Sequence, residues 1–390
     1  MKTIVDFRMS GKKVIIRCDF NVPIENGVIT DDSRIRESVE TIKLAINATA
    51  KVIILSHLGR VKTEADMANN SLFPVSQRLS ELLGEPVKFV PYTTGDEVEF
   101  AVNTMRNSEV LMLENTRFED IDGNKESGND PDLGKYWASL GDIFINDAFG
   151  TLHRAHASNV GIAGYLPHGI GLLVKKELDI MTEAMENPKH PFIVILGGAK
   201  VSDKIGVIEN LATKADKIFI GGGMCFTFLK ALGNDVGGSL VDDTKLELCK
   251  EVYEKYKDKI ILPRDIVVGS SFTPMSTLRL ANVNDIRPND IGMDMGVQTM
   301  DNLKNLLVGS GLVIWNGPIG VFEIDKFNVG TRKLLEYLGS SRKVILGGGD
   351  TAAAAARFGY KNKFYHISTG GGATLEFMEG KVLPGIEAMK

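Results

Sequence analysis

The sequence predicts an α/β protein with two doubly wound domains, each built around a mostly parallel sheet. Short runs of β-branched residues alternate along the chain with longer stretches in which apolar residues recur three and four positions apart, such as FPVSQRLSELLG. This alternation is typical of βαβ units with helices on both faces of a sheet. Ten such runs are many for one sheet, so two domains fit the 390 residues better than one.

The ten apolar runs mark the expected strands in chain order. Four lie in the first half, at 14–20, 51–57, 110–115 and 143–149. Six lie in the second half, at 192–198, 217–223, 260–269, 311–317, 343–349 and 364–372. Their shortness and their β-branched residues favour strands over helices.

A helix predicted over 171–186 separates the two groups of strands. A stretch rich in glycine and proline precedes it, and Pro188 and Pro191 follow it. Because glycine and proline interrupt regular structure, a helix that lies between them is a hinge candidate. We therefore expect a first domain over 1–170, a hinge helix over 171–186 and a second domain over 187–374.

The composition is ordinary for a soluble protein, with 43% hydrophobic and 24% charged residues. The net charge of −5 does not suggest binding to nucleic acid or to an anionic membrane, and no apolar run is long enough to span a membrane. Cys18, Cys225 and Cys249 form no CxxC pair, which favours free buried thiols over a catalytic cysteine. Since the N-terminus has no apolar leader, we expect a cytoplasmic protein.

The residues that follow the expected strands differ between the two halves of the chain. Ligands bind at the carboxyl ends of the strands in open parallel sheets, so these positions are the most informative about function. The first half places arginines and histidines there, in DFN, SHLGR, ENTRF and NDAFGTLHRAHAS. The second half places glycines and two lysines there, in GGAKVSDK, GGGM, WNGP, GGGDT and STGGG.

The arginines of the first half predict an anionic ligand. The basic residues at these positions are Arg34, Arg60, Arg117 and Arg154, with His57, His153 and His156 in the same segments. Each arginine alone could be a solvated surface charge, but no arginine occurs between Arg154 and Arg264, so the cluster belongs to one domain. A guanidinium binds a carboxylate or a phosphate through two parallel hydrogen bonds. We therefore expect a small substrate with several negative charges.

The segment GGGDTAAAAARFG over 347–359 predicts a strand, a glycine turn and a helix. Backbone N–H groups and the positive end of the helix make such a turn a phosphate site, and several glycine turns in one sheet point to a nucleotide. Asp350 would repel a phosphate unless Mg²⁺ lay between them, so we predict that Asp350 binds Mg²⁺. The alternative is that Asp350 only caps the helix.

Two familiar nucleotide motifs are absent or incomplete. The chain contains no G-x-x-x-x-G-K-[ST], which excludes a P-loop enzyme. Gly347, Gly349 and Ala352 match G-x-G-x-x-A, but the acidic residue that a dinucleotide site needs about twenty positions later is missing. A dehydrogenase is therefore disfavoured.

The basic surroundings of the expected substrate indicate the phosphoryl acceptor. A hydroxyl acceptor usually needs a carboxylate base, for which Asp19 and Asp147 are the candidates. An arginine-lined site suits an acceptor that is already an anion, and a carboxylate needs no base at pH 7. The product would be an acyl phosphate. Catalysis would then rest on positioning and charge neutralisation by Lys200, Lys204, Arg34, Mg²⁺ and glycine N–H groups.

The order and spacing of eight motifs resemble those of the phosphoglycerate kinase family. The motifs are RCDFNVP, SHLGR, ENTRF, NDAFGTLHRAHAS, GGAKVSDK, WNGPIGVFE, GGGDT and STGGGA, and the resemblance covers essentially the whole chain. It implies two Rossmann-like doubly wound parallel-sheet domains around a cleft, joined by a hinge helix, and a monomer. It also implies reversible phosphoryl transfer between 1,3-bisphosphoglycerate and ADP, which gives 3-phosphoglycerate and ATP in glycolysis.

The resemblance also implies a role for each domain and for individual residues. The first domain would bind phosphoglycerate through Asp19, Phe20, Asn21, Arg34, His57, Leu58, Gly59, Arg60, Arg117 and Arg154. The second would bind nucleotide through Gly197, Gly198, Lys204, Gly221, Gly222, Gly292, Asn316, Pro318, Glu323, Gly348, Gly349, Asp350 and Thr351. Glu323 would bind the ribose and Asp350 the Mg²⁺. The groups that meet the transferring phosphoryl group would be Arg34, Lys200, Lys204, Gly371 and Gly372, and the segment 375–390 would return to pack on the first domain.

Three residues depart from the usual pattern of this family, namely Leu152, Val297 and Arg264, and none of them removes an expected ligand. An alternative is an inactive relative that serves as a binding or surface-adhesion protein. Loss of Lys200, Lys204, Arg34 or Asp350 would favour that alternative, but all four are present.

Overall fold

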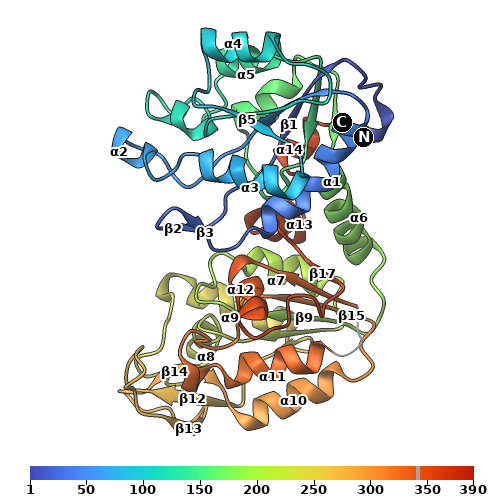
Figure 1. Ribbon diagram of the computed structural model, residues 1–390. Helices are drawn as coiled ribbons and strands as arrows, with labels where there is room; N and C mark the ends of the chain where they lie inside the picture. The colour runs from blue at the N-terminus through green and yellow to red at the C-terminus, as the bar shows by residue number, and fades with distance from the viewer. Residues whose placement is uncertain (340–342) are drawn as a thin grey trace. The chain divides into compact units, whose positions relative to one another are not determined.

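The computed structural model describes residues 1–339 and 343–390. The contacts divide the chain into two units (Figure 1): unit 1 comprises Met1–Ile180 and Val382–Lys390, and unit 2 comprises Met181–Lys381. Both ends of the chain lie in unit 1. Each unit holds a six-stranded parallel sheet, so the predicted α/β class with two parallel-sheet domains is confirmed.

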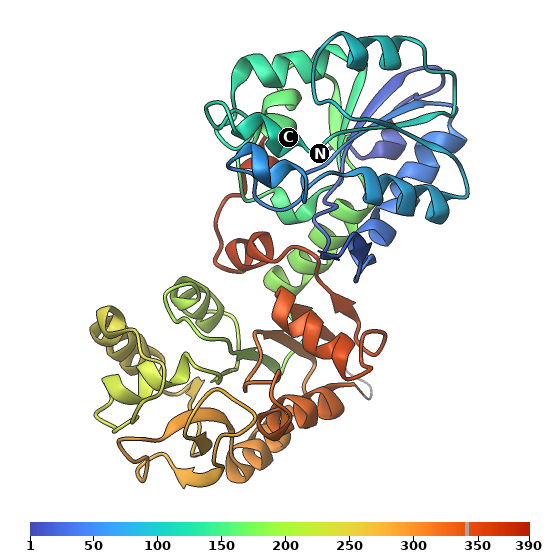
Figure 2. The same cartoon turned by 60° about the vertical axis from the view of Figure 1, so that its left-hand side comes forward.

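The sheet of unit 1 has the strand order β5-β6-β4-β1-β7-β8, and every neighbouring pair is parallel. Its strands are β1 (Lys13–Arg17), β4 (Lys51–Leu55), β5 (Val87–Val90), β6 (Val110–Leu113), β7 (Ile143–Asn146) and β8 (His168–Ile170), and a separate hairpin is formed by β2 (Ile24–Glu25) and β3 (Val28–Ile29). Its helices are α1 (Ser33–Asn47), α2 (Glu64–Met67), α3 (Phe73–Leu83), α4 (Asp96–Asn103), α5 (Pro131–Ser139) and α14 (Pro384–Glu387), with short 3-10 or π turns at Ile4–Asp6, Thr116–Asp120, Phe149–Thr151 and Ala157–Gly161. Figure 2 shows helices on both faces of this sheet.

Burial on both faces explains why these strands are continuous apolar runs. In β1, Val14 and Ile16 belong to a core cluster that includes Ile35 and Ile42 of α1. Ile15 is equally buried, and it points to the opposite face because side chains alternate along a strand. A parallel sheet covered on both sides therefore needs an apolar residue at nearly every position.

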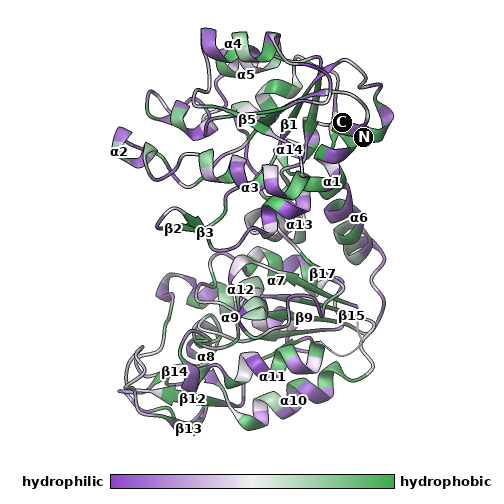
Figure 3. Ribbon diagram, in the orientation of Figure 1, coloured by the Kyte–Doolittle hydropathy of each residue, from purple (hydrophilic) through white to green (hydrophobic). Residues whose placement is uncertain are grey.

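Unit 2 contains a second parallel sheet, with the order β11-β10-β9-β15-β16-β17, and a three-stranded antiparallel sheet, with the order β13-β12-β14. The parallel strands are β9 (Phe192–Leu196), β10 (Lys217–Ile220), β11 (Ile260–Ile261), β15 (Leu312–Asn316), β16 (Val344–Gly347) and β17 (His366–Ile367), and the antiparallel ones are β12 (Asp265–Gly269), β13 (Arg279–Asn282) and β14 (Ile291–Met295). The helices are α7 (Ile205–Ala212), α8 (Cys225–Ala231), α9 (Leu246–Tyr256), α10 (Val297–Leu307), α11 (Val329–Leu338), α12 (Gly349–Arg357) and α13 (Gly372–Met378), with 3-10 turns at Asp243–Lys245 and Asp325–Phe327. Figure 3 shows apolar residues along central strands such as β9 and β15.

The predicted strand, glycine turn and helix over 347–359 are confirmed. Strand β16 ends at Gly347, and α12 begins at Gly349. Gly348 between them has φ +87°, a backbone conformation that residues with a Cβ rarely adopt. The N-cap position belongs to Gly348, and Asp350 is the second residue of the helix, so its carboxylate does not cap α12.

Several strand predictions need correction. The run 260–269 is two strands in different sheets, β11 and β12, because Pro263 between them cannot donate to a strand ladder. The run 364–372 contributes only two residues to β17, and Gly372 already begins α13. The sequence analysis missed β2, β3, β5, β8, β13 and β14, and the last two pair antiparallel with β12.

The helix predicted over 171–186 is α6 (Leu172–Glu186), and the boundary between the units falls inside it, after Ile180. The C-terminal segment expected over 375–390 is divided between the units. Its first part belongs to unit 2, because the Met378 carbonyl of α13 accepts a hydrogen bond from Asn210 Nδ2 at 2.7 Å. Only Val382–Lys390 lies in unit 1, where Gly385 N donates to the Leu152 carbonyl at 2.9 Å.

No helix within the described residues combines the length and the apolar character needed to cross a membrane.

Candidate functional site

Six of the predicted phosphoglycerate-binding residues form one connected network in unit 1. Arg34 Nη1 donates to Asp19 Oδ2 at 2.5 Å. Gly59 is held from two sides, since its N–H donates to Asn21 Oδ1 at 2.8 Å and its carbonyl accepts from Arg117 Nη1. His57 Nδ1 lies 3.9 Å from Asp19 Oδ1. These groups come from four segments of the chain, so the topology of the sheet gathers them.

Phe20 and Leu58 shape the network from within the core. Both side chains are buried in the unit 1 cluster. Phe20 N donates to Ser56 Oγ at 2.9 Å, and Leu58 N donates to Asn115 Oδ1 at 3.1 Å. These contacts fix the backbone of the two loops that carry Asp19 and Gly59. The side chains of Phe20 and Leu58 therefore pack in the core.

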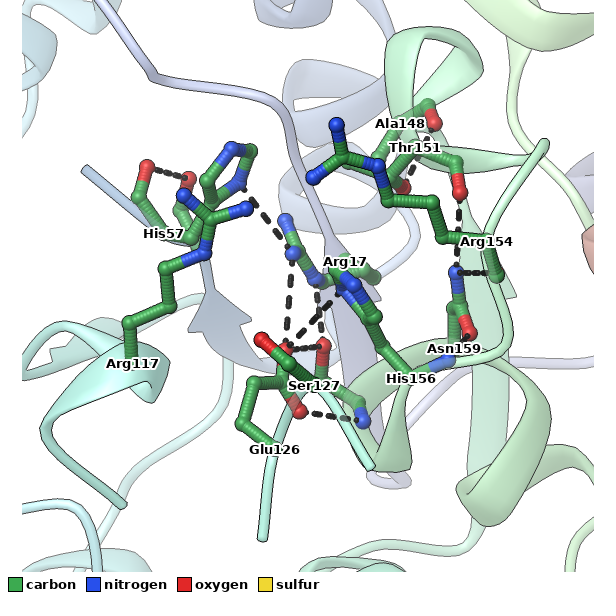
Figure 4. Close-up of polar contacts among 12 residues, drawn as sticks. Arg17, His57, Arg117, Glu126, Ser127, Ala148, Thr151, Arg154, His156 and Asn159 are labelled. Atoms are coloured by element: carbon green, nitrogen blue, oxygen red, sulfur yellow. Dashed lines mark hydrogen bonds and ion pairs between the residues drawn. The ribbon is translucent and has the colours of Figure 1, made fainter. Parts of the chain in front are cut away.

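A buried ion pair that the sequence analysis missed lies at the centre of this network (Figure 4). Arg17 and Glu126 are both fully buried, with Nη2 of the guanidinium 3.7 Å from Oε1 of the carboxylate. Arg17 Nη2 also lies 3.3 Å from His57 Nδ1. A charged residue at the end of the apolar run KVIIR was a signal for Arg17, because a buried charge needs a partner. Glu126 lies in a loop, and no local pattern marks it.

Both buried histidines near Arg17 are held in the neutral form. Burial lowers the pKa of His57 well below its ordinary value, and the positive charges of Arg17 and Arg117 lower it further. Burial, followed by the charges of Arg17 and Arg117, lowers the pKa of His156 to about 3. His156 Nδ1 has no hydrogen-bond partner among the described residues and lies 3.8 Å from Glu126 Oε1. The arginines therefore supply the positive charge of the site.

The remaining arginines differ in their exposure. Arg117 is 8% exposed, and burial, together with the charges of Arg154 and Arg17, lowers its pKa. Arg154 is exposed, and its Nε donates to His153 Nε2 at 3.1 Å. Arg60 is exposed. A buried arginine whose pKa is lowered by neighbouring arginines favours an anionic ligand that would relieve their repulsion.

In unit 2, backbone hydrogen bonds hold the predicted glycine turns together at the carboxyl ends of β9, β15 and β16. Gly197 N donates to the Asn316 carbonyl at 2.9 Å, and Gly198 N donates to the Pro318 carbonyl at 2.8 Å. Thr351 Oγ1 accepts from Gly317 N at 2.7 Å, which joins the first turn of α12 to the end of β15.

Glycine is required at some positions of these turns by packing within the protein, whereas at others the space beside it is open. A Cβ on Gly197 would lie 2.2 Å from the Pro318 carbonyl oxygen, and one on Gly222 would lie 2.6 Å from Gly198 N. A Cβ on Gly292 would lie 1.8 Å from the Phe226 ring, so protein packing already accounts for these three glycines. A Cβ on Gly349 or Gly371 would meet no described atom within 4 Å. At these two positions the open space leaves room for a ligand beside the backbone.

The charged residues that were predicted for the nucleotide site, Lys200, Lys204 and Asp350, lie in or next to these turns. Lys204 precedes α7, and its Nζ is near Gly198, where a Cβ would lie 3.2 Å from it. Burial lowers the pKa of Lys204, while Asp203 and Asp350 act to raise it. Lys200 and Asp350 are exposed. Asn316 is 2% exposed, and its Nδ2 has no hydrogen-bond partner within the described chain, so a polar donor is available there.

Glu323, Gly221, Gly371 and Gly372 also lie in unit 2. Glu323 is exposed, and its carbonyl accepts from Arg357 Nη1 at 3.2 Å. Gly221 N donates to the Leu196 carbonyl at 2.8 Å. Gly371 has φ +50° and immediately precedes α13. Over the part of the chain that the structure describes, no three His, Cys, Asp or Glu side chains form a metal cluster, so Asp350 would act as a single carboxylate ligand.

The three departures from the family pattern leave both sets of residues intact. Leu152 is fully buried against the C-terminal segment, where a Cβ on Gly385 would lie 2.7 Å from its Cδ2. Val297 begins α10 and is 54% exposed. Arg264 N donates to Thr299 Oγ1 at 3.0 Å.

The cysteines are free and buried, as predicted. Burial raises the pKa of Cys18 and Cys225, and it raises the pKa of Cys249 to about 12. A thiol with a raised pKa is a poor nucleophile at neutral pH. The three thiols therefore serve as core residues.

The chain matches a family model described as "Phosphoglycerate kinase" over residues 4–381. It is 56% identical over 391 residues to the phosphoglycerate kinase of Enterococcus faecalis, with 100% of this chain and 98% of the relative covered. It is 55% identical over 393 residues to that of Fusobacterium nucleatum, with 100% and 99% covered.

The fold is similar to the solved structure of phosphoglycerate kinase from Coxiella burnetii, with a TM-score of 0.87 at 37% identity and with 100% of this chain and 98% of that chain covered. Family model, curated relatives and solved structure agree over essentially the whole length. The chain therefore belongs to the phosphoglycerate kinase family.

Proposed function

We propose that this chain catalyses the reversible transfer of a phosphoryl group between 1,3-bisphosphoglycerate and ADP, which gives 3-phosphoglycerate and ATP. The observation that carries the proposal is the basic network of unit 1, in which Arg34, Arg117 and His57 surround Asp19 and Gly59. A ligand with both a phosphate and a carboxylate matches several guanidinium groups. Full-length similarity to phosphoglycerate kinases supports the same activity.

In this proposal unit 1 binds phosphoglycerate. Arg60, Arg117 and Arg154 neutralise its negative charge, and Asn21, His57 and Gly59 orient it. Arg34, which donates a hydrogen bond to Asp19, is proposed to contact the carboxyl end of the ligand, where the phosphoryl group is transferred. Support comes from the buried position of Arg117 among like charges, since an anion would stabilise that arrangement.

Unit 2 binds the nucleotide in the same proposal. Two features support it: the open space beside Gly349 and Gly371, and the unpaired Nδ2 of Asn316. Backbone N–H groups at the start of α12 favour phosphate oxygens. Glu323 is the proposed ribose ligand, and Lys204 the proposed phosphate ligand.

The residues around Asp350 fit a Mg²⁺ ion that accompanies the nucleotide. The carboxylate of Asp350 is exposed in the first turn of α12, and no residue of the described chain donates a hydrogen bond to it. Mg²⁺ prefers hard oxygen ligands, keeps most of its waters and needs only one or two protein carboxylates. When bound, the ion would neutralise phosphate charge that Asp350 alone would repel.

The proposed acceptor is the carboxyl group of 3-phosphoglycerate. Its ionised oxygen attacks the γ-phosphorus of ATP, a new P–O bond forms, the bond to the ADP oxygen breaks, and ADP leaves with that electron pair. No general base is required, because the attacking oxygen is already deprotonated at pH 7. Arg34, Lys200, Lys204 and the N–H groups of Gly371 and Gly372 are proposed to stabilise the charge on the transferring group.

We further propose that the protein acts as a cytoplasmic monomer, with no nucleic-acid or membrane partner. The free thiols suit a reducing compartment. Each proposed ligand set is complete within one unit, so neither needs a residue from a second copy.

The test is a coupled assay that follows ATP consumption with 3-phosphoglycerate as the acceptor. The unaltered protein should turn over only when both substrates and Mg²⁺ are present. Lys204→Met should remove most turnover, whereas the matched control Lys250→Met, at an exposed position on α9, should retain it. A folded protein without turnover would contradict the proposal and favour the inactive binding or adhesion protein, which no observation on the described residues supports.

A further inference from the structure

The guanidinium of Arg17 contacts several groups in the basic network of unit 1. Its Nε donates to Ser158 Oγ at 2.7 Å, its Nη1 donates to the Cys18 carbonyl, and its Nη2 lies 3.3 Å from His57 Nδ1. Every arm of the group therefore has a partner, and Arg17 is fully buried. A planar group held at three points cannot rotate without breaking several of these hydrogen bonds.

Glu126 supplies the negative charge that holds Arg17 in this place. Its Oε2 accepts from Ser158 N at 2.9 Å, and its Oε1 accepts from Ser158 Oγ. Ser158 Oγ thus bridges the ion pair, since it also accepts from Arg17 Nε. The Glu126 carbonyl accepts from Ala157 N at 2.9 Å. The carboxylate and the guanidinium are consequently fixed to one turn, Ala157–Gly161.

The chemistry of arginine decides how His57 is protonated. A guanidinium has five N–H donors and no acceptor, so the 3.3 Å contact requires His57 Nδ1 to act as the acceptor. An accepting Nδ1 carries no hydrogen, and the ring is then neutral with its hydrogen on Nε2. No acceptor within the described residues takes a hydrogen bond from Nε2.

The charges around the ring agree with a neutral His57. Burial disfavours a positive ring, and so do the charges of Arg17, Arg117 and Arg34. The carboxylate of Asp19 would favour a positive ring, but its Oδ1 is 3.9 Å from Nδ1, which is beyond hydrogen-bond distance. Figure 4 shows Arg17 between His57 on one side and Glu126 and His156 on the other.

We infer that Arg17, anchored by Glu126, is a positioning residue that fixes His57 as the neutral tautomer with its hydrogen on Nε2. The role of this tautomer rests on the proposed function, in which the Nε2–H of His57 would donate a hydrogen bond to an oxygen of phosphoglycerate. The site would thereby gain a hydrogen-bond donor without a further positive charge among the arginines. Neither Arg17 nor Glu126 would need to touch the ligand.

The first test is nitrogen-15 NMR of the unaltered full-length protein at neutral pH, with the His57 signals assigned by their loss in His57→Gln. Two-bond proton–nitrogen correlations distinguish the two neutral tautomers from the charged ring. The expected result is a single neutral form with the hydrogen on Nε2. A ring that is charged, or that carries its hydrogen on Nδ1, would overturn the inference.

The second test removes the anchor. Arg17→Met with Glu126→Gln removes both buried charges together, which avoids leaving one unpaired. The expected result is loss of the pure Nε2–H signature, with a KM for 3-phosphoglycerate raised about tenfold by the loss of one oriented hydrogen bond and an unchanged KM for ATP. An unchanged His57 signature in the folded double variant would show that Arg17 does not fix the tautomer.

A matched control separates positioning from general loss of stability. Asp265→Asn removes a buried carboxylate of unit 2 that accepts from Thr299 N at 2.8 Å. It should lower the melting temperature while leaving the His57 signature and both KM values unchanged. Failure of the proposed function would appear as an inactive unaltered protein with the expected His57 signature, whereas failure of this inference would appear in the NMR signature of an active protein.

Discussion

Thr351 Oγ1 accepts a hydrogen bond from Gly317 N at 2.7 Å, so a side chain in the first turn of α12 satisfies the backbone at the end of β15. Both residues are buried. Gly317 also has φ +92°, and a Cβ on it would lie 2.4 Å from the Gly197 carbonyl oxygen. One hydroxyl therefore helps to hold the ends of neighbouring strands at the proposed nucleotide site.

Replacing Thr351 by valine should destabilise unit 2. Valine has nearly the same shape but no acceptor, so the buried N–H of Gly317 would lose its partner, at a cost of about 1–3 kcal/mol. Thr351→Ser keeps the hydroxyl and should cost less. Urea unfolding of the three proteins measures the difference, and equal midpoints for valine and threonine would show that this hydrogen bond contributes nothing.

Asp350→Asn should abolish most Mg²⁺-dependent activity with little effect on folding. The carboxylate is exposed and accepts no hydrogen bond from any described residue, so the free energy of unfolding should change by no more than about 0.5 kcal/mol. Calorimetry should show weaker binding of Mg-ADP and unchanged binding of metal-free ADP. Asp243→Asn, an exposed control in the same unit, should change neither. Near-normal turnover of Asp350→Asn at saturating Mg²⁺ would argue against a metal ligand.

Arg60→Ala should weaken binding of 3-phosphoglycerate and leave nucleotide binding unaffected. The loss should be about 1.5–3 kcal/mol, the scale of a hydrogen bond to a charged group. Arg60 is exposed, so its removal should not disturb the fold. Calorimetry on each ligand separately checks this, with the exposed Arg106→Ala as the control. Equal losses for both ligands would contradict the assignment of one ligand to each unit.

Asp147 should make the free energy of unfolding depend on pH. Its Oδ1 accepts from Leu173 N at 3.0 Å and from Val174 N at 3.3 Å at the start of α6, and burial raises its pKa to about 7. In the folded protein the proton is therefore retained above the unfolded pKa of about 3.9. The stabilisation of the folded state by protonated Asp147 is fully present below the unfolded pKa. It is lost as pH rises through the folded pKa of about 7, by at most about 1.4 kcal/mol per pH unit.

Asp147→Asn keeps an acceptor oxygen for both N–H groups but cannot ionise. Urea unfolding between pH 4 and pH 8 should show that the unaltered protein loses stability relative to this variant as pH rises. A constant difference between the two proteins across that range would show that Asp147 does not titrate there.

Local sequence determined the type of most elements, and it predicted one set of ligand-binding residues in each half of the chain. Continuous apolar runs such as Val14–Ile16 suit strands covered on both faces, and glycine at 348 suits a turn that needs positive φ. Arginines at the expected strand ends of the first half, and glycine turns at those of the second, already predicted two different ligands. These features depend on residue type and spacing, which the sequence contains in full.

Only the tertiary structure decided which groups meet. Arg17 and Glu126 lie 109 positions apart in the chain, and no periodic pattern links them, yet they form the buried pair behind His57. Phe20 and Leu58 carry motif positions but point into the core. The assignment of β12 to an antiparallel sheet and the split of the C-terminal segment after Lys381 are likewise long-range outcomes. Such pairings depend on how distant segments exclude water from each other, and a local stretch of sequence does not determine them.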